Sequence, residues 1–495
     1  MTRQVRRVAT VMLVLFGALF VNLNVIQLIR ADEFVNHPAN HRLLIQEYRI
    51  QRGPIVVGDE RIAFSVETDH QLKYLRRYDP ARLYAHLVGY YSVIFGRAGL
   101  EAALNETLTG TPTDLLAQNL AQLLGAQDPA GNVIRLTVDP AAQEAARDAL
   151  GDRPGAIVAL DPISGAVLAH VSNPTYDPNL LSSHDPQQIR TYWQQLNDHP
   201  DEPLANRATQ RRYQPGSTMK LIVAAAALEH GFSVDTAFED VAGYSPPGTT
   251  HAIRNYGGGT CRGGGTLTLA EALVVSCNTV FARLGVELGA DALVEQAEKF
   301  GFNRRPPYEL PVVESVIPDD LDPPQAAQAA LGAFDVQATA LQTAMVVQAI
   351  ANRGVLMRPH VVAEVLDRSG RRVRGADSGP WIDGAFTAQA MTEDNAAKLA
   401  DLMVRVVRDG TGRRAQIDGA TVGGKTGTAD PGQRITPHVW FAGFAATPDP
   451  GGGAPVPRVA VAVVLPNAGE GATGGGLAAP MARAVMAAAL QRTGG

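Results

Sequence analysis

Residues 213–231 read YQPGSTMKLIVAAAALEHG and carry the first sign of chemistry in this chain of 495 residues. A proline-glycine pair before Ser217 and a glycine after His230 predict a helix between them. On a helix, positions i and i+3 share a face, so the hydroxyl of Ser217 and the amine of Lys220 are expected within hydrogen-bond reach. The helix N-terminus also favours negative charge on the serine oxygen. The alternative is a capping serine beside a surface lysine.

Lysine is rare in this chain, which gives Lys220 more weight. Five of the 43 basic residues are lysines and the others are arginines. Only lysine, of these two residue types, can lose its proton in a protein site. Two of the five, Lys220 and Lys425, lie in motifs that suggest a function.

The second motif is Ser276-Cys277-Asn278, at the junction of two helical patterns. A capping box, Thr268-Leu-Ala-Glu271, opens the first of these helices. Taken alone, a polar triplet of this kind is more often a simple cap or turn.

The third motif is Lys425-Thr426-Gly427-Thr428, which follows Val422-Gly-Gly and reads as the start of a strand. Glycine there permits close approach of a ligand to the backbone, and a cation with two hydroxyl groups suits a carboxylate.

The order S-x-x-K, S-x-N, K-T-G is the signature of penicillin-binding proteins and serine β-lactamases. The chain resembles the class B transpeptidases among them, and its arginine bias and compact length are most similar to a division-associated actinobacterial group. One motif departs from the family pattern, because Val56–Arg61 lacks the usual x-Asp-Arg after Arg52-Gly-Pro-Ile. The other segments that carry the resemblance are Asn206–Ala208, Tyr213–Gly216, Gly410–Gly412, Trp440–Gly443 and Gly99–Glu101.

The resemblance implies a residue-by-residue mechanism. A neutral Lys220 takes the proton of Ser217, which attacks the penultimate D-Ala carbonyl of a stem peptide, and Ser276 relays a proton to the leaving nitrogen. The backbone amides of Ser217 and Thr428 are expected to form the oxyanion hole. The implied substrate-binding residues are Asn278, Lys425, Thr426, Gly427 and Thr428.

The expected fold is α+β: a penicillin-binding transpeptidase domain with an antiparallel sheet, flanking helices and an inserted helical subdomain. Strands predicted at both ends of this domain close the sheet. The predicted strands cover 156–160, 166–171, 439–445 and 459–465, and the predicted helices cover 217–230, 269–275, 280–288, 292–300, 338–352, 395–408 and 478–491. Asp139-Pro140 is a strong signal for the start of a further helix, and Gly151 is expected to end it.

The N-terminal run 8–29 is apolar and long enough to cross a bilayer. Arg3, Arg6 and Arg7 before it predict that this end stays in the cytoplasm and that the rest of the chain lies outside. We therefore expect a single-pass plasma-membrane protein, although a cleaved signal peptide is the alternative. The expected divisions are a cytoplasmic tail 1–7, a transmembrane anchor 8–29, a small non-catalytic pedestal domain of dimerisation type 30–151 and the transpeptidase domain 152–495.

Cys261 and Cys277 are the only cysteines, and outside the cytoplasm they are a candidate disulfide. The eleven histidines show no ligand spacing, so neither a metal nor a cofactor is expected. A net charge of −6 argues against binding nucleic acid.

The expected partners are peptidoglycan stem peptides, β-lactam antibiotics and the plasma membrane. The roughly 120 residues between anchor and catalytic domain are too few for a second enzyme. A membrane glycan polymerase and other divisome proteins are therefore expected to act with this chain. The alternative functions are a D,D-carboxypeptidase or β-lactamase, in which water replaces the acceptor amine, and a non-enzymatic β-lactam sensor or division scaffold.

Overall fold

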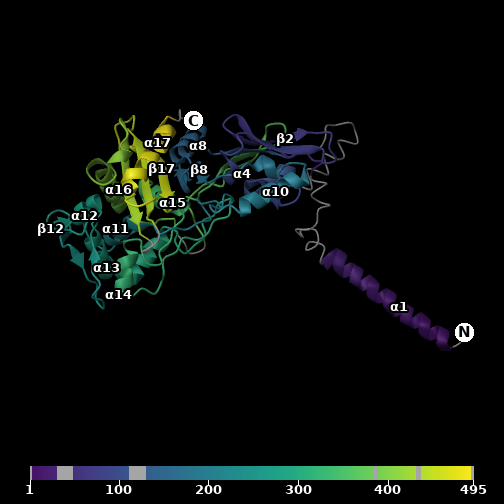
Figure 1. The fold of residues 1–495 in the computed structure, drawn as a ribbon, viewed down its shortest axis with the longest axis horizontal. Coiled ribbons are helices and arrows are strands. Elements are labelled where there is room, and N and C mark those ends of the chain that lie inside the picture. The colour runs from purple at the N-terminus through teal and green to yellow at the C-terminus, as the bar shows by residue number, and fades with distance from the viewer. Residues whose placement is uncertain (1–2, 30–47, 111–129, 384–387, 431–435, 492–495) are drawn as a thin grey trace.

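The computed structural model describes residues 3–29, 48–110, 130–383, 388–430 and 436–491. Two parts of the expected pedestal, 30–47 and 111–129, lie outside these ranges. Figure 1 shows β2 (Glu60–Glu67) and α4 (Ala85–Val88) of the pedestal, with α10 (Pro186–Asn197) from the catalytic half of the chain packed beside them. Next to them is a larger unit that holds β17, α17 and the helices α11 to α14.

The larger unit is built on a five-stranded sheet with the order β15-β16-β17-β7-β8, in which every neighbouring pair is antiparallel. β17 pairs with β7 although some 300 residues separate them, so the expected sheet closed by distant strands is confirmed. β7 and the part of β17 from Val459 to Leu465 are apolar runs, because helices cover both faces of the sheet. The strands are β7 (Gly155–Leu160), β8 (Val167–Asn173), β15 (Thr421–Ala429), β16 (His438–Thr447) and β17 (Val456–Leu465).

One face of this sheet is covered by α8 (Pro140–Leu150) and α17 (Ala479–Leu490), whose apolar side chains form one core with it. The carboxylate of Asp139 accepts a hydrogen bond from the N–H of Ala142, as its position before the helix predicts. α8 lies before residue 152, so the structural unit around this sheet begins earlier in the chain than the domain boundary expected from the sequence.

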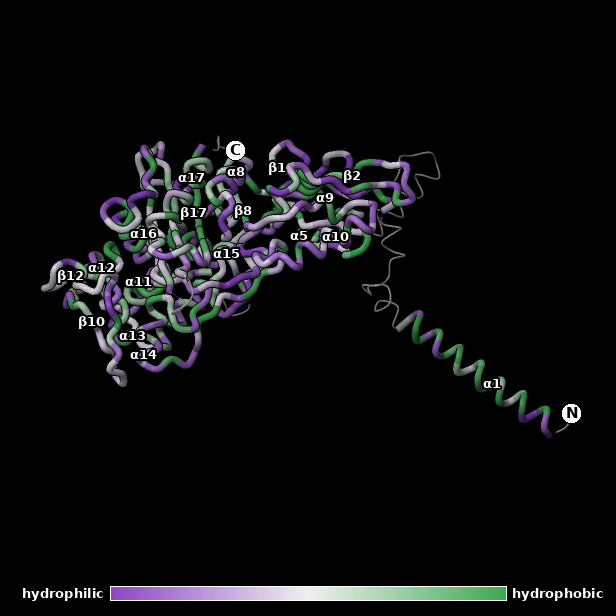
Figure 2. Tube along the Cα trace, viewed as in Figure 1, coloured by the Kyte–Doolittle hydropathy of each residue, from purple (hydrophilic) through white to green (hydrophobic). Residues whose placement is uncertain are grey.

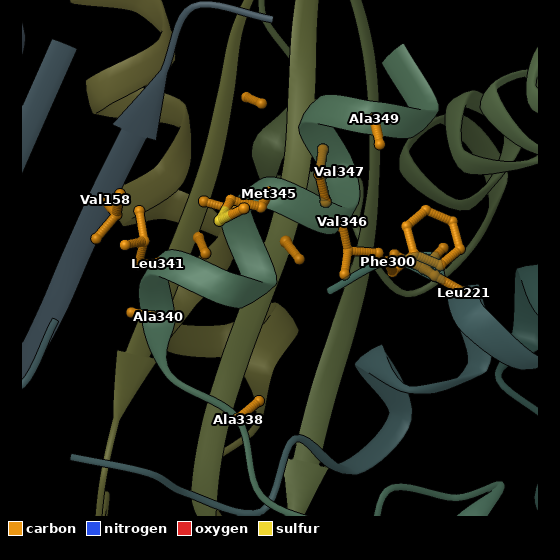
Figure 3. Close-up of a cluster of buried hydrophobic side chains, with 14 of the residues drawn as sticks. Val158, Leu221, Phe300, Ala338, Ala340, Leu341, Met345, Val346, Val347 and Ala349 are labelled. Carbon is orange, nitrogen blue, oxygen red and sulfur yellow. The ribbon is translucent and has the colours of Figure 1, made fainter. Parts of the chain in front are cut away.

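The other face is covered by α15 (Ala340–Ala351), which is buried on all sides. Leu341 and Met345 reach toward Val158 of β7, while Val346 lies against Phe300 and Leu221 (Figure 3). α15 therefore connects the sheet to the helical subdomain, and an all-round apolar helix is the sequence such a place requires.

The helical subdomain contains α11 (Lys220–Glu229), α12 (Leu269–Val275), α13 (Asn278–Lys299) and α14 (Pro323–Ala329), with α16 (Glu393–Asp409) packed against it. Thr268 and Glu271 form the expected capping box of α12. The two helices expected over 280–288 and 292–300 are one element with a kink at Gly289, where φ is +79°.

The pedestal sheet has the order β14-β13-β6-β1-β2-β3. Two of its strands come from the catalytic half of the chain, because β13 pairs antiparallel with β6 and β14 follows it at the edge. The two units therefore exchange chain segments. The strands are β1 (Ile55–Val57), β2 (Glu60–Glu67), β3 (Tyr74–Tyr78), β6 (Val133–Leu136), β13 (Val362–Leu366) and β14 (Arg372–Gly375).

A buried ion cluster holds the pedestal together. Glu101 accepts hydrogen bonds from Arg52 Nε at 2.5 Å and Arg76 Nε at 2.6 Å, and Arg52 also donates to Asn105. Burial raises the pKa of Glu101, but the charges of Arg76 and Arg52 outweigh it and hold this pKa below its ordinary value. Arg76 thus contributes a second cation although the usual x-Asp-Arg motif is missing.

The N-terminal helix α1 (Arg3–Asn24) continues into a π-turn, Val25–Ile29. Arg3–Gln27 is long and apolar enough to cross a membrane, and none of its spanning side chains is buried. Figure 2 shows its run of apolar residues.

The remaining described elements are short. They are α4 (Ala85–Val88), α5 (Gly99–Ala103), α6 (Asn105–Thr109), α9 (Pro178–Leu181), α10 (Pro186–Asn197), η2 (Gly216–Thr218), η3 (Arg413–Ala415), η4 (Gly474–Ala478) and the strand pairs β4 (Tyr91–Ser92) with β5 (Gly96–Arg97), β9 (Ala237–Glu239) with β12 (Thr266–Thr268), and β10 (Gly243–Tyr244) with β11 (Ile253–Arg254).

Candidate active site

Ser217 lies in the 3-10 turn η2, directly before α11. Gly216 has φ of +54°, and a Cβ there would lie 2.8 Å from the carbonyl oxygen of Thr428. Glycine is therefore required for this tight turn, which brings the serine beside β15. Ser217 is partly exposed, and its Oγ makes no hydrogen bond to the described part of the chain.

Lys220, the first residue of α11, is fully buried. Its Nζ donates to the backbone oxygen of Ser276 at 2.8 Å and to Asn278 Oδ1 at 2.7 Å, and lies 3.4 Å from Ser276 Oγ. Burial, with the nearby charge of Lys425 as a second cause, holds the pKa of Lys220 well below its ordinary value. This shift favours the neutral form of the amine, which is the form that can accept a proton.

The sequence predicted a hydrogen bond between Ser217 and Lys220, but the described part of the structure shows none between these two side chains. The reason is geometric, because the Nζ of Lys220 points toward the backbone oxygen of Ser276 and the Oδ1 of Asn278 and donates to both. A neutral amine bonded in this way keeps one lone pair, which is what a base needs. Catalytic hydrogen bonds often shorten only when a ligand binds.

Ser276 follows α12 in the left-handed conformation, with φ of +61°. Its Oγ accepts a 2.8 Å hydrogen bond from Lys425 Nζ, which also donates to the carbonyl of Thr426 at 3.1 Å. Lys425 is fully buried, and burial lowers its pKa to about 7. The unusual backbone of Ser276 thus places one hydroxyl between two lysines.

Hydrogen bonds to the backbone and a disulfide fix the position of Asn278 and its neighbours. Asn255 Oδ1 accepts the backbone N–H groups of Asn278 and Thr279, each at 3.0 Å. A disulfide joins Cys261 to Cys277, the residue between Ser276 and Asn278. The S-x-N motif is therefore connected to the 255–265 loop by a covalent bond as well as by hydrogen bonds.

β15 is the edge strand of the sheet, and it faces the nucleophile turn. A Cβ on Gly427 would lie 2.7 Å from the carbonyl oxygen of Pro215, so only glycine allows this approach. The hydroxyls of Thr426 and Thr411 are 2.7 Å apart, and Thr428 Oγ accepts the N–H of Gly474 at 3.4 Å. An unpaired strand edge can also bind an extended peptide through its backbone.

These residues surround a cavity of about 550 Å³ that includes Ser217, Ser276, Asn278, Thr426 and Thr428 in its wall. Larger cavities occur between the two units and lack these groups. The chemistry, rather than the volume, identifies the site. Several lining residues were given no role from the sequence, and these are Tyr256, Thr411, Arg413, Arg414, Thr473 and Gly474–Gly476.

Two signals could have indicated part of this set. Gly410-Thr411-Gly412 resembled the family motif, and the two arginines follow it directly. Gly474–Gly476 is a run of three glycines in the sequence, and in the structure it begins η4 and packs against Thr428 and Trp440.

One cluster among the described residues has the composition of a metal site: Asp240, Cys261 and Cys277. Its sulfur atoms are joined to each other, and the Asp240 carboxylate accepts the N–H groups of Cys261, Arg262 and Gly264. These bonds give the three residues a structural role, which is to hold the loop around Cys261 in place.

Family models match two parts of the chain. The penicillin binding protein transpeptidase domain matches residues 155–487, and the penicillin binding protein A dimerisation domain matches residues 52–134.

Curated relatives match nearly the whole length. The chain is 38% identical, over 99% of both chains, to the peptidoglycan D,D-transpeptidase PbpA of Mycolicibacterium smegmatis, and equally to that of Mycobacterium tuberculosis. It is 30% identical to the peptidoglycan D,D-transpeptidase MrdA of Acinetobacter baumannii, over 82% of this chain and 65% of that one.

Solved structures are also similar to this chain over most of its length. The ceftriaxone acyl-enzyme complex of penicillin-binding protein A from M. tuberculosis is 38% identical, covers 90% of this chain and all of that chain, and has a TM-score of 0.84. The penicillin G acyl-enzyme complex of the same protein is also 38% identical, covers 89% of this chain and all of that chain, and has a TM-score of 0.82.

Proposed function

Because the chain belongs to the family of penicillin-binding proteins with a transpeptidase domain, we propose that it is a peptidoglycan D,D-transpeptidase with Ser217 as its nucleophile. The observation that carries the assignment is the hydroxyl of Ser276 held between Lys220 and Lys425, next to a partly exposed serine. That arrangement provides a neutral base, a proton relay and a cation around one cavity.

In the proposed acylation step, the lone pair of Lys220 accepts the proton of Ser217 as Oγ attacks the penultimate D-Ala carbonyl. The backbone N–H groups of Ser217 and Thr428 stabilise the oxyanion. The C–N bond then breaks, and the proton passes from Lys220 through Ser276 to the nitrogen of the leaving D-Ala. The 2.8 Å bond from Lys425 orients the relay hydroxyl.

In the second step, the amine of another stem peptide attacks the ester carbonyl and loses a proton to Lys220. Ser217 Oγ leaves, recovers that proton, and a new amide cross-link remains. β-Lactams acylate the same serine, and the released amine stays tethered to the acyl group, which makes them long-lived inhibitors.

Substrate binding in this proposal uses the wall of the cavity. Asn278 holds a substrate amide, while Thr426 and Thr428 bind the terminal carboxylate with Lys425 behind them. Gly427 lets the extended donor peptide lie close to the β15 edge.

The proposed location is the plasma membrane, with α1 as the anchor and the catalytic unit outside. The arginines at the start of α1 support this topology, and so does the disulfide, which is rare in reducing compartments. The pedestal would set the distance between membrane and active site, and a membrane glycan polymerase with other divisome proteins would supply the strands to be joined in cell-wall growth and division.

The test is intact-protein mass spectrometry after incubation with penicillin G. The wild type is expected to gain one adduct that maps to Ser217, and Ser217→Ala is expected to gain none. Ser369→Ala, in the exposed β13–β14 turn, is the control and should label normally. An adduct on the Ser217→Ala protein would refute the assignment.

The lifetime of this adduct, together with an assay of D-Ala release from a pentapeptide, separates the alternatives. A transpeptidase keeps the penicilloyl adduct for hours, whereas a β-lactamase releases it as penicilloic acid. A sensor or scaffold would be labelled but would not release D-Ala from a pentapeptide substrate, with or without an acceptor amine. A carboxypeptidase would release D-Ala to water without forming the amide.

A further inference from the structure

The ammonium of Lys425 does not reach the cavity. Its Nζ is bonded to Ser276 Oγ and to the carbonyl of Thr426, and the side chain is fully buried. Among the described residues that line the cavity, neither Lys425 nor Lys220 is present. A carboxylate that approaches from solvent therefore meets other groups first.

Two exposed cations do line this cavity, Arg413 and Arg414 of η3. Arg413 donates to the backbone oxygen of Asp409 at 2.9 Å. The hydrogen bond from Arg408 is the main cause that lowers the pKa of the Asp409 carboxyl, and the charge of Arg413 is a smaller cause, so Asp409 balances part of that charge. Arg414 has no acidic partner in the part of the chain that the structure describes. It uses one N–H for the carbonyl of Gly476, at 3.1 Å, and a guanidinium has five.

The hydrogen bond from Arg414 to Gly476 places the arginine near the threonine hydroxyls of the cavity wall. Gly476 belongs to the turn η4, and Gly474 of the same turn donates to Thr428 Oγ. Thr411, three residues before Arg414, contacts Thr426 through its hydroxyl. Arg414 therefore lies on the wall formed by the residues that, in the proposed function, bind a carboxylate.

We propose that Arg414 is a specificity-determining residue of the transpeptidase site, which attracts and binds the terminal carboxylate of the donor peptide and of β-lactams. It supplies the solvent-facing positive charge that the buried Lys425 does not. This inference rests on the proposed acyl transfer at Ser217. The role is recognition, so it concerns carboxylated ligands and leaves the reacting atoms untouched.

The experiment compares the second-order acylation rates of penicillin G and of its methyl ester, which lacks the negative charge. Wild type is expected to favour the acid. Arg414→Gln should lower the rate for the acid about tenfold or more, the usual effect of one charge-assisted hydrogen bond, and leave the rate for the ester unchanged. Arg414→Lys should recover part of the preference.

The matched control is Arg408→Gln, which removes an exposed arginine of α16 outside the cavity wall. It should keep the wild-type ratio of the two rates. Salt should weaken the preference in the wild type and have little effect in Arg414→Gln. An unchanged acid-to-ester ratio in Arg414→Gln would overturn the inference, whereas failure of wild type to be acylated by either compound would refute the proposed function itself.

Discussion

The side chains of Lys220 and Lys425 meet at one oxygen atom, Ser276 Oγ, at distances of 3.4 and 2.8 Å from their Nζ atoms. Two buried amines so close together cannot both hold a positive charge at low cost. The two lysines therefore divide the tasks: the lowered pKa of Lys220 favours its neutral form, and Lys425 is the group that can carry the charge.

This division predicts different results for the same substitution at the two positions. Lys220→Arg places a permanent charge where a base is needed, so penicillin acylation should fall by about 10² to 10⁴-fold. Lys425→Arg keeps a cation and should retain a measurable part of the rate, reduced by crowding in a buried place. Stopped-flow acylation rates would check this, with circular dichroism to show that both variants fold. Equal losses would mean that the roles are assigned wrongly.

The lowered pKa of Lys425, about 7 against an ordinary 10.5, predicts a pH dependence. As the pH rises through 7, Lys425 loses its charge and the acylation rate for penicillin G should decrease, although not to zero, because Arg414 also attracts the carboxylate. In Lys425→Arg this decrease should be absent. A wild-type profile that is flat from pH 6 to 9 would contradict the prediction.

Stability should change in the opposite direction over this range. Between about pH 7 and 10.5 the unfolded chain keeps a proton on Lys425 that the folded protein has lost. The free energy of unfolding should therefore rise with pH in this window. Urea denaturation at several pH values, with Lys425→Met as a reference that cannot titrate, would isolate the contribution.

The disulfide predicts an effect on both stability and rate. The cysteines are 16 positions apart, and loss of the bond in Cys261→Ser/Cys277→Ser should lower the free energy of unfolding by about 3 kcal/mol. Because Cys277 lies between Ser276 and Asn278, acylation should also become slower. Mass spectrometry after alkylation of denatured, non-reduced wild type should find no free thiol, and two modified thiols would contradict the bond.

The buried Arg52–Glu101–Arg76 cluster predicts a large cost for Glu101→Gln. Two buried guanidinium groups would lose their anionic partner, which should reduce the free energy of unfolding by about 3–5 kcal/mol. The control is Glu202→Gln, which breaks an exposed ion pair with Arg211 and should cost less than about 1 kcal/mol. Equal midpoints in urea for the two variants would show that the cluster contributes little.

Sequence patterns predicted the elements whose signals are local. Asp139 and Gly151 mark the ends of α8, and the capping box at Thr268 marks the start of α12. Four apolar strands, two at each end of one domain, were enough to predict the antiparallel sheet. Local patterns placed the S-x-N triplet at a junction of two helices and Lys425 in a strand, as the structure has them. The helix expected from Ser217 begins instead at Lys220, and Ser217 lies in the turn η2 before it.

The parts that could not be predicted depend on distant contacts. Nothing in residues 362–375 indicates that β13 pairs with β6 rather than with the catalytic sheet, because strand pairing is decided by tertiary packing. Helical spacing suggested a bond from Lys220 to Ser217, but acceptors 56 and 58 positions away bind the amine instead. A glycine run such as Gly474–Gly476 has no side-chain pattern that could reveal its place in the cavity wall.

The pairing of β13 with β6 has a consequence for how the chain is made. In the proposed topology the N-terminal half would cross the membrane first, and the edge of β6 that pairs with β13 would stay unpaired until residue 366 has crossed. Such an edge is a template for faulty association with other chains. The nascent protein is therefore expected to need protection over more than 200 residues of translocation, and a pedestal expressed without the later hairpin should precipitate where the full-length protein stays in solution.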